Sequence, residues 1–342
     1  MTREQIGTAD GHTVERITLQ DAEICAVILS FGGVIQSLRV KDRQGNERDV
    51  VLGFSDVESY LNQEYYIGTV IGRCANRIGG ANFTLDGRQY QLEANEGANH
   101  LHGGSKGFWN VPFEVISAGR DFVTLQRTSP DGESGYPGTL NTQITYSLSG
   151  KSLTIDYTAS SDQDTVVNLT HHSYFNLEKD HTGDILGERL TVFADQFTEI
   201  DEACSSTGTI LDVANTPFDL REGKLIGQCV ADDHEQMRRG SGLNHNYILS
   251  KPLDTLGNVA KVVSSDGQLA MQVTSTLPGV QVYTGNYLDG SLTGKNGEAY
   301  GRFGGVCLET QYYPDAVHFS AFPSPVLRAG SLYHHKTQFS FF

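Results

Sequence analysis

The chain has 342 residues, and its 25 Lys and Arg residues against 41 Asp and Glu residues give a formal net charge of -16 at pH 7. Nucleic acids and anionic membrane surfaces repel so negative a protein, so the composition argues against both as partners. Hydrophobic residues make up 38% of the chain, which is typical of a folded protein. No stretch approaches the ~20 consecutive apolar residues of a membrane helix.

The cysteines and the first residues of the chain predict a cytoplasmic protein. Residues 1–10 lack the apolar run of a signal peptide. The cysteines are scattered and odd in number, and none forms a Cys-x-x-Cys pair, which excludes a zinc knuckle and a thioredoxin-like motif. We expect reduced thiols at all five positions, which are Cys25, Cys74, Cys204, Cys229 and Cys307.

In chain order, the first local signal is a short helix. Ser55 and Glu58 have the spacing of a capping box, which predicts a helix that opens there and runs through Leu61. Further along, Asp86-Gly87 predicts a tight hairpin between residues 83–85 and 90–92, because Gly accepts a positive φ and Asp tolerates one.

Alternating apolar and polar residues then predict longer strands. Residues 144–148 and 153–157 alternate in this way on either side of Ser149-Gly150, and residues 269–273 do so after Asp266-Gly267. Helical periodicity is scarce, and no linker or internal repeat divides the chain. We therefore predict an all-β protein, one large antiparallel β-sandwich with a few short helices, as a single domain over residues 1–342.

Polar residues interrupt the strand-like pattern in a few segments, which are the candidates for chemistry. They are residues 72–78 with 99–104, residues 168–177, residues 242–247 and residues 305–311. In the last of these, Glu309 stands in an apolar run, where a carboxylate is costly unless it is paired or functional. An ion pair with Arg77 or Arg73 is the structural alternative.

The histidines of these segments allow several interpretations. His100 and His102 are two residues apart, so on a strand they would point to one face, a spacing that metal ligands also use. Adjacent His171 and His172 would point to opposite faces, so at most one of them faces a given site. Taken singly, each histidine is better explained as a structural residue, and the argument for a site is their joint occurrence with Glu309.

Five segments, in this order along the chain, resemble the galactose mutarotase (aldose 1-epimerase) family. They are Gly72-Arg73 with Ala75-Asn76-Arg77-Ile78, Leu101-His102-Gly103-Gly104, Asn168 with Thr170 and residues 172–177, Gly279-Val280-Gln281 with Tyr283-Thr284-Gly285-Asn286, and Leu308-Glu309. The resemblance extends from Gly32-Gly33 to Leu327-Arg328-Ala329-Gly330 and so covers essentially the whole chain.

The resemblance implies a galactose mutarotase-like supersandwich that interconverts the α- and β-anomers of aldohexoses such as galactose and glucose, with no cofactor and no metal. It implies that His172 is the general acid and Glu309 the general base. It assigns the substrate-binding roles to Asn76, Arg77, His102, Asn244 and Gln281. Asn244 departs from the family, which usually has Asp there; this bears on the affinity and the sugar preference, not on the acid–base pair, and we expect weaker sugar binding.

The implied chemistry needs these residue types. A cyclic aldose opens when the C1 hydroxyl loses a proton and the ring oxygen O5 gains one, so one base and one acid suffice. A carboxylate ionised at pH 7 suits the base, and a histidine with an ordinary pKa near 6.5 suits the acid, particularly if Glu309 favours its charged form.

Other classes of protein stay open at this point. A carbohydrate-binding or regulatory protein on the same scaffold would not need both His172 and Glu309. A cupin-like metal enzyme would use His100, His102, His172 and Glu309 as ligands. A glycosidase would need a second catalytic carboxylate near Glu309, and none is identified. The expected partner is a small sugar, and the expected oligomeric state is a monomer or a homodimer.

Overall fold

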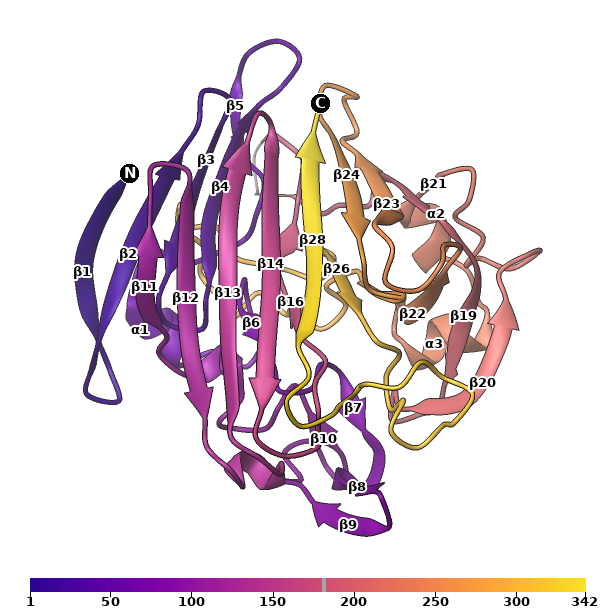
Figure 1. The fold of residues 1–342 in the computed structure, drawn as a ribbon. Coiled ribbons are helices and arrows are strands. Elements are labelled where there is room, and N and C mark those ends of the chain that lie inside the picture. Colours follow the sequence, from indigo (N-terminus) through magenta and orange to yellow (C-terminus); the bar gives the residue numbers. More distant parts are fainter. Residues whose placement is uncertain (180–182) are drawn as a thin grey trace.

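Antiparallel β-sheets form most of the structure, a computed structural model in which residues 1–179 and 183–342 are described (Figure 1). The first sheet contains β1 (Thr2–Ala9), β2 (His12–Gln20), β3 (Ile24–Leu29), β4 (Ile35–Lys41) and β5 (Glu47–Asp49). The predicted all-β class is confirmed.

Two larger sheets contain most of the remaining strands. The nine-stranded sheet has the order β11 (Glu114–Ala118), β12 (Phe122–Ser129), β13 (Leu140–Ser149), β14 (Ser152–Ser161), β28 (Tyr333–Phe341), β24 (Ala270–Ser275), β23 (Gly257–Val263), β18 (Arg189–Val192) and β21 (Lys224–Leu225). The six-stranded sheet has the order β17 (Tyr174–Phe175), β26 (Val306–Gln311), β25 (Gly279–Tyr283), β22 (Asn244–Leu249), β19 (Ala194–Ile200) and β20 (Ser206–Asp212).

Short elements complete the described part of the chain. Two-stranded ladders pair β6 (Val70–Ile71) with β16 (Thr170–His171), β7 (Arg77–Ile78) with β10 (His100–Leu101), β8 (Asn82–Leu85) with β9 (Arg88–Gln91), and β15 (Thr165–Val166) with β27 (Val326–Leu327). The helices are α1 (Val57–Leu61), α2 (Ile226–Val230) and α3 (Glu235–Arg239), with 3-10 turns at Gly79–Ala81, Phe108–Asn110 and Glu133–Gly135. No helix among the described residues has the length and apolar character needed to cross a membrane.

The nine-stranded sheet packs on both of the other sheets. Strands β12 and β13 contact β2, and β13 also contacts β3, on the side of the five-stranded sheet. Further across the same face, the rings of Phe175 and Phe339 lie 4.9 Å apart, and the hydroxyls of Thr310 and Thr337 are hydrogen-bonded. Apolar side chains of all three sheets merge into one buried core. The strand β28, near the end of the chain, lies between β14 and β24 and so closes this layer (Figure 1).

Both predicted hairpins are present, but one of them turns one residue later than predicted. The turn Asp86-Gly87 joins β8 to β9, with φ of 50° and 81°. Strand pairing continues to Ser149 and Ser152, so the next hairpin turns at Gly150 and Lys151 rather than at Ser149-Gly150.

The predicted helix near residue 55 exists as α1, but its capping residue differs from the predicted one. Asp56 is the N-cap, and its carboxylate accepts from the Ser59 amide. An aspartate is as good a cap as a serine, and its position one residue later decides where the helix begins.

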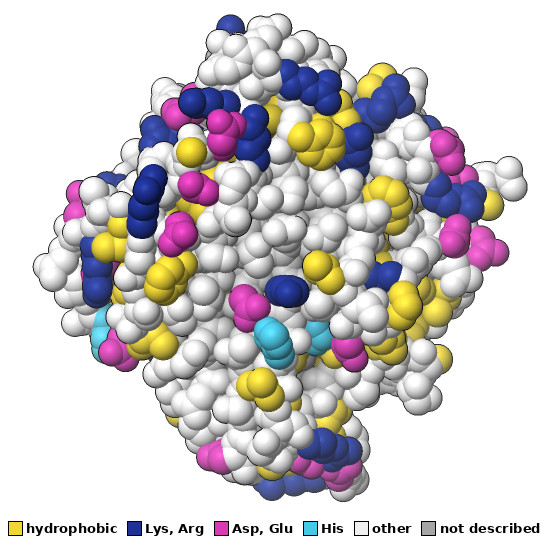
Figure 2. Space-filling view, turned by 45° about the horizontal axis from the view of Figure 1, so that its top comes forward, with side chains coloured by type: hydrophobic (Ala, Val, Ile, Leu, Met, Phe, Trp, Pro, Cys, Tyr) yellow, Lys and Arg dark blue, Asp and Glu magenta, His cyan; other side chains and the backbone are white. Residues whose placement is uncertain are grey.

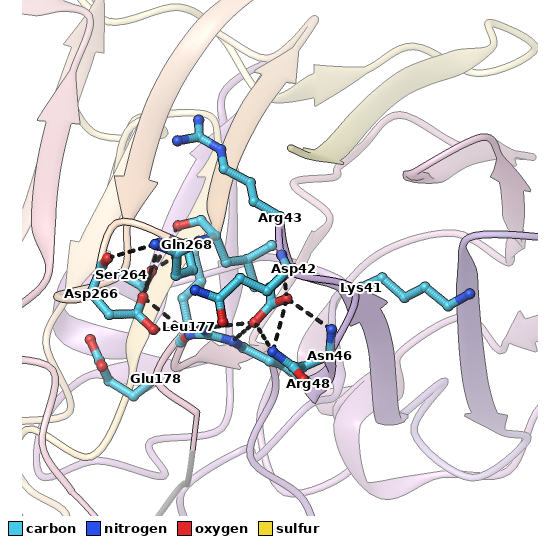
Figure 3. Close-up of polar contacts among 12 residues, drawn as sticks. Lys41, Asp42, Arg43, Asn46, Arg48, Leu177, Glu178, Ser264, Asp266 and Gln268 are labelled. Atoms are coloured by element: carbon cyan, nitrogen blue, oxygen red, sulfur yellow. Dashed lines mark hydrogen bonds and ion pairs between the residues drawn. The ribbon is translucent and has the colours of Figure 1, made fainter.

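A buried arginine joins the first sheet to the nine-stranded sheet (Figure 3). Arg48 in β5 pairs at 3.0 Å with Asp42, which lies between β4 and β5, and both side chains are almost fully buried. The same guanidinium donates to Asp266 at 2.6 Å, in the turn between β23 and β24, and to the Leu177 carbonyl at 3.0 Å. Three distant segments of the chain therefore share one cation.

We expect Arg48→Met to destabilise the protein by on the order of 3 kcal/mol, because it leaves the buried Asp42 carboxylate without its cation. Urea denaturation followed by tryptophan fluorescence measures the change. Arg43→Met is the control on the same hairpin, where an exposed guanidinium makes one long contact with the Gly267 carbonyl. A loss of stability as large in the control as in Arg48→Met contradicts the role given to the buried pair.

Candidate active site

A small polar cavity of about 220 Å³ opens beside the six-stranded sheet. It is smaller than the ~300–1,000 Å³ typical of sites for drug-sized ligands, so it suits a small molecule. Its lining comprises Glu64, Tyr65, Tyr66, Asn76, Arg77, Glu96, Leu101, His102, His172, Tyr174, Asn244, Tyr283, Tyr287 and Glu309. In the face shown in Figure 2, histidine side chains lie beside acidic and basic side chains.

Three neighbouring strands supply one wall of the cavity. In β26, Val306 and Leu308 belong to the apolar core, whereas Glu309 points the other way and lines the cavity. Strand register then places Gln281 of β25 opposite Glu309, and Asn246 of β22 opposite Gln281. The period of two along each strand thus separates an apolar face from a polar face that bears the site.

A tight turn places His102 at the cavity. Strand β10 ends at Leu101, and His102 adopts a φ of 52°, in the left-handed region. Its Nδ1 accepts from the Asn76 amide at 3.2 Å, which leaves Nε2 to face the cavity as the protonated nitrogen. Gly103 follows because a Cβ there would lie 1.8 Å from the Gly72 carbonyl oxygen.

The expectation that His100 and His102 share one face is wrong. The His100 imidazole bonds the Glu93 carbonyl at 2.7 Å and the Tyr136 hydroxyl at 2.8 Å, and it does not line the cavity. The physical reason is the left-handed backbone of His102, which ends the strand between the two residues. His100 is therefore a structural histidine.

The expectation for His171 and His172 is confirmed. His171 contacts the Gly33 carbonyl at 3.3 Å and the Ser173 hydroxyl at 2.9 Å, on the side away from the cavity. His172 faces the cavity, and its Nε2 lies 3.6 Å from Oε1 of Glu309. Its Nδ1 lies 3.5 Å from the Cys307 sulfur.

Glu309 is buried without a compensating cation in direct contact. Its exposure is 2%, and Oε2 has no hydrogen-bond partner among the described residues. The structural alternative, an ion pair with Arg77 or Arg73, is not formed. Arg77 pairs with Glu96, and Arg73 donates to the Ser129 hydroxyl and to nearby carbonyls. A buried carboxylate that lines a cavity and has an oxygen without a hydrogen-bond partner is a candidate functional group.

Burial shifts the pKa values of the two groups toward their neutral forms. Loss of water around Glu309 raises the pKa of its carboxyl to about 8, with the charge of Arg77 opposing the shift. Burial lowers the pKa of His172 to about 4. These directions correct the predicted ones, because desolvation of each charged form outweighs the attraction between them across 3.6 Å. Between these two pH values the pair holds one proton in all.

The other predicted substrate-binding residues meet around this pair. Asn76, Arg77, His102 and Asn244 line the cavity. Gln281 lies one step behind the wall, and its Nε2 donates to Oδ1 of Asn244 at 2.8 Å. Gln281 therefore does not line the cavity itself, but it holds the Asn244 side chain that does.

Sequence reasoning missed part of the lining. Tyr66, with a φ of 58°, packs its ring at 4.6 Å from His102 and 5.0 Å from Trp109. Glu64, Glu96 and Tyr287 were not singled out either, because they lie in irregular segments where no periodicity marks a side chain as facing a site. Of the two aromatic residues of β17, Tyr174 lines the cavity, whereas Phe175 belongs to the core.

Of the four ligands that a cupin-like metal enzyme would use, the structure brings three together and places His100 elsewhere. Atoms of His102, His172 and Glu309 that could bind a metal lie within 4.8 Å of one another. His100, the fourth ligand of that alternative, is held by Tyr136 and Glu93 instead. The absence of a metal and of an organic cofactor stays a prediction.

Comparisons with known proteins agree over nearly the whole chain. The sequence model of the aldose 1-epimerase family matches residues 15–340. Galactose mutarotase from Rattus norvegicus is 44% identical over 333 residues, which cover 97% of this chain and 95% of that protein. Aldose 1-epimerase from Escherichia coli K12 is 32% identical over 337 residues, which cover 97% and 96%.

Solved structures show the same fold. The structure of a GalM/aldose epimerase homologue from C. elegans superposes with a TM-score of 0.88 at 28% identity, and the match covers 96% of this chain and 98% of that one. Together with the fold, these relatives place the protein among the isomerases. The chain belongs to the aldose 1-epimerase family.

We expect the imidazole of His172 to stay neutral at pH 6 and to take up a proton only near pH 4, because burial penalises the imidazolium. NMR spectra of the histidine-labelled protein, recorded from pH 7 to pH 4, measure this. His318 is an internal reference whose pKa shifts in the opposite direction, since its hydrogen bond to Asp315 raises its pKa above 6.5. A charged His172 at pH 6 contradicts the dominance of desolvation.

Proposed function

We propose that this protein interconverts the α- and β-anomers of aldohexoses such as galactose and glucose by acid–base opening and closure of the sugar ring. The observation that carries the proposal is the placement of the Glu309 carboxylate, buried and with an unpartnered oxygen, 3.6 Å from the imidazole of His172 at the wall of a small polar cavity. The names of the relatives, galactose mutarotase and aldose 1-epimerase, support the same reaction.

In the forward direction, Glu309 takes the proton of the C1 hydroxyl, and protonated His172 gives a proton to O5. The bond between C1 and O5 breaks, and the product is the open-chain aldehyde. Rotation about C1–C2 presents the other face of the carbonyl, and closure reverses both transfers. Arg77, His102 and Asn244, with Asn76 supporting and Gln281 behind, hold the hydroxyls while this rotation takes place.

The pKa shifts make the neutral forms the resting state of the pair, so the carboxylate and imidazolium that open the ring are the minor form of the singly protonated pair. Opening converts a carboxylate and an imidazolium into a carboxylic acid and a neutral imidazole, which are the forms that burial stabilises. The sign of the pH dependence follows. Activity falls in acid when the pair takes up a second proton and falls in alkali when it loses its last one, so the rate is bell-shaped with limbs near pH 4 and pH 8.

We expect His172→Asn and Glu309→Gln each to lower kcat by ~10²-fold or more, because each removes one of the two proton-transfer groups. Polarimetry on freshly dissolved α-galactose and α-glucose measures the rate, and thermal unfolding checks that the fold survives. His171→Asn is a matched control, since that imidazole points away from the cavity. Near wild-type turnover by either site variant, with unchanged unfolding, rules out its role.

Asn244 is expected to affect binding more than chemistry. Its carbonyl oxygen already accepts from Gln281, so a carboxylate at this position would add a second, charged acceptor for a sugar hydroxyl. We expect Asn244→Asp to lower KM several-fold at nearly constant kcat, a gain of about 1 kcal/mol in uniform binding. Polarimetric KM and kcat for a panel of aldoses test this. An unchanged KM for every aldose contradicts the hypothesis, and a higher KM indicates a natural substrate other than the usual hexoses.

We also propose the compartment, the partners, the domain organisation and the oligomeric state of the protein. Five unpaired, buried cysteines support a reducing compartment, the cytoplasm. The charge of -16 supports the absence of nucleic acid and membrane partners. A single domain over residues 1–342 fits a sheet in which β28 lies between strands from distant parts of the chain. The state in solution is a monomer or a homodimer.

A further inference from the structure

The guanidinium of Arg77 is held in a fork by a carboxylate that the proposed reaction does not use. Arg77 donates through Nε to Oε2 of Glu96 at 2.7 Å and through Nη2 to Oε1. The fork leaves Nη1 as the nitrogen of Arg77 without a partner among the described residues. Both side chains line the cavity. A planar guanidinium held at two nitrogens has a fixed orientation, so Glu96 determines where Nη1 points.

The backbone fixes Glu96 in turn. Its amide donates to the Asn99 carbonyl at 3.1 Å, and its carbonyl accepts from the Asn99 amide at 2.9 Å, which closes a tight turn at Gly97. Asn99 is anchored to the Ser205 hydroxyl at 3.0 Å. The carboxylate therefore sits at a defined place on the cavity rim, although its side chain is 34% exposed.

Two carboxylates are within the influence of this one arginine. The charge of Arg77 acts on Glu309 and lowers its pKa, yet Oε2 of Glu309 has no hydrogen-bond donor. An Arg77 paired with Glu309 instead would block the oxygen that has to receive the proton of the sugar. The pairing with Glu96 is what keeps the cation in the cavity and away from direct contact with the base.

We propose that Glu96 is a positioning residue, which orients Arg77 toward the sugar and prevents it from pairing with the catalytic base Glu309. This inference rests on the proposed function. It assigns no contact with the reacting atoms to Glu96, which acts through Arg77.

Removal of the Glu96 charge has a predictable sign at the base. The freed Arg77 cation stabilises the Glu309 carboxylate, so the pair loses its last proton at lower pH. The titratable groups around Glu309 are the Arg77 cation, the carboxylates of Glu64 and Glu96, the imidazoles of His102 and His172, and four groups whose pKa values burial raises, Tyr66, Tyr174, Tyr283 and Cys307.

The test compares Glu96→Gln with Glu64→Gln. Both residues line the cavity, and each variant removes one negative charge, but only Glu96 contacts Arg77. Polarimetry gives kcat, KM and the pH profile of kcat/KM for the aldose that the wild-type protein turns over best. For Glu96→Gln we expect kcat/KM to fall roughly 10-fold, with a rise in KM and a fall in kcat, and the alkaline limb to move down by about one pH unit. For Glu64→Gln we expect the alkaline limb of the kcat/KM profile to stay within a few tenths of a pH unit of its wild-type position.

Three results overturn the proposal. One is a Glu96→Gln variant with wild-type KM and alkaline limb. Another is an equal displacement of the limb in Glu64→Gln, which shows a general effect of rim charge. The third is a lower melting temperature in Glu96→Gln with an unmoved limb, which shows a structural role alone. Failure of the proposed function itself looks different, because the wild-type protein then epimerises none of the aldoses in the panel.

Discussion

The site depends on the burial of a carboxylate beside an imidazole. A buried charge is costly, so Glu309 and His172 both shift toward their neutral forms, and they share one proton over the range around neutrality. For the proposed reaction, which already proceeds in water, two positioned proton-transfer groups are enough.

The fold has to hold these groups in place without neutralising them. Glu309 stands in the middle of a strand whose other face is in the apolar core, so its backbone has no freedom to move away from the cavity. His172 follows a two-residue strand that pairs with β6, and its neighbour His171 is fixed by Gly33 and Ser173. The cations near the site are satisfied elsewhere, Arg73 by Ser129 and backbone carbonyls and Arg77 by Glu96.

Amides rather than charges complete the wall on the side of β22 and β25. Asn244 and Gln281 bond each other, and the buried amide of Asn246 lies in register beside Gln281. A neutral wall has a smaller desolvation cost than a charged one, but each of its hydrogen bonds to a sugar is weaker. The proposed effect of Asn244 is therefore on sugar affinity rather than on proton transfer.

Much of this could be predicted from the sequence alone. Alternation over residues 144–148 and 153–157 identified strands, Asp86-Gly87 identified a hairpin, and the opposite orientation of His171 and His172 follows from the pleat of a strand. The order of the family motifs along the chain indicated the family, and the catalytic roles of His172 and Glu309 stay a prediction. Such features depend on residues close together in the chain, and local geometry is enough to decide them. Only the tertiary structure decided that His100 leaves the site, that Arg77 belongs to Glu96, and that burial moves both pKa values toward the neutral forms. Each of these depends on a left-handed residue, on a partner in a distant turn, or on the exclusion of water by strands far apart in sequence, and no local pattern encodes them.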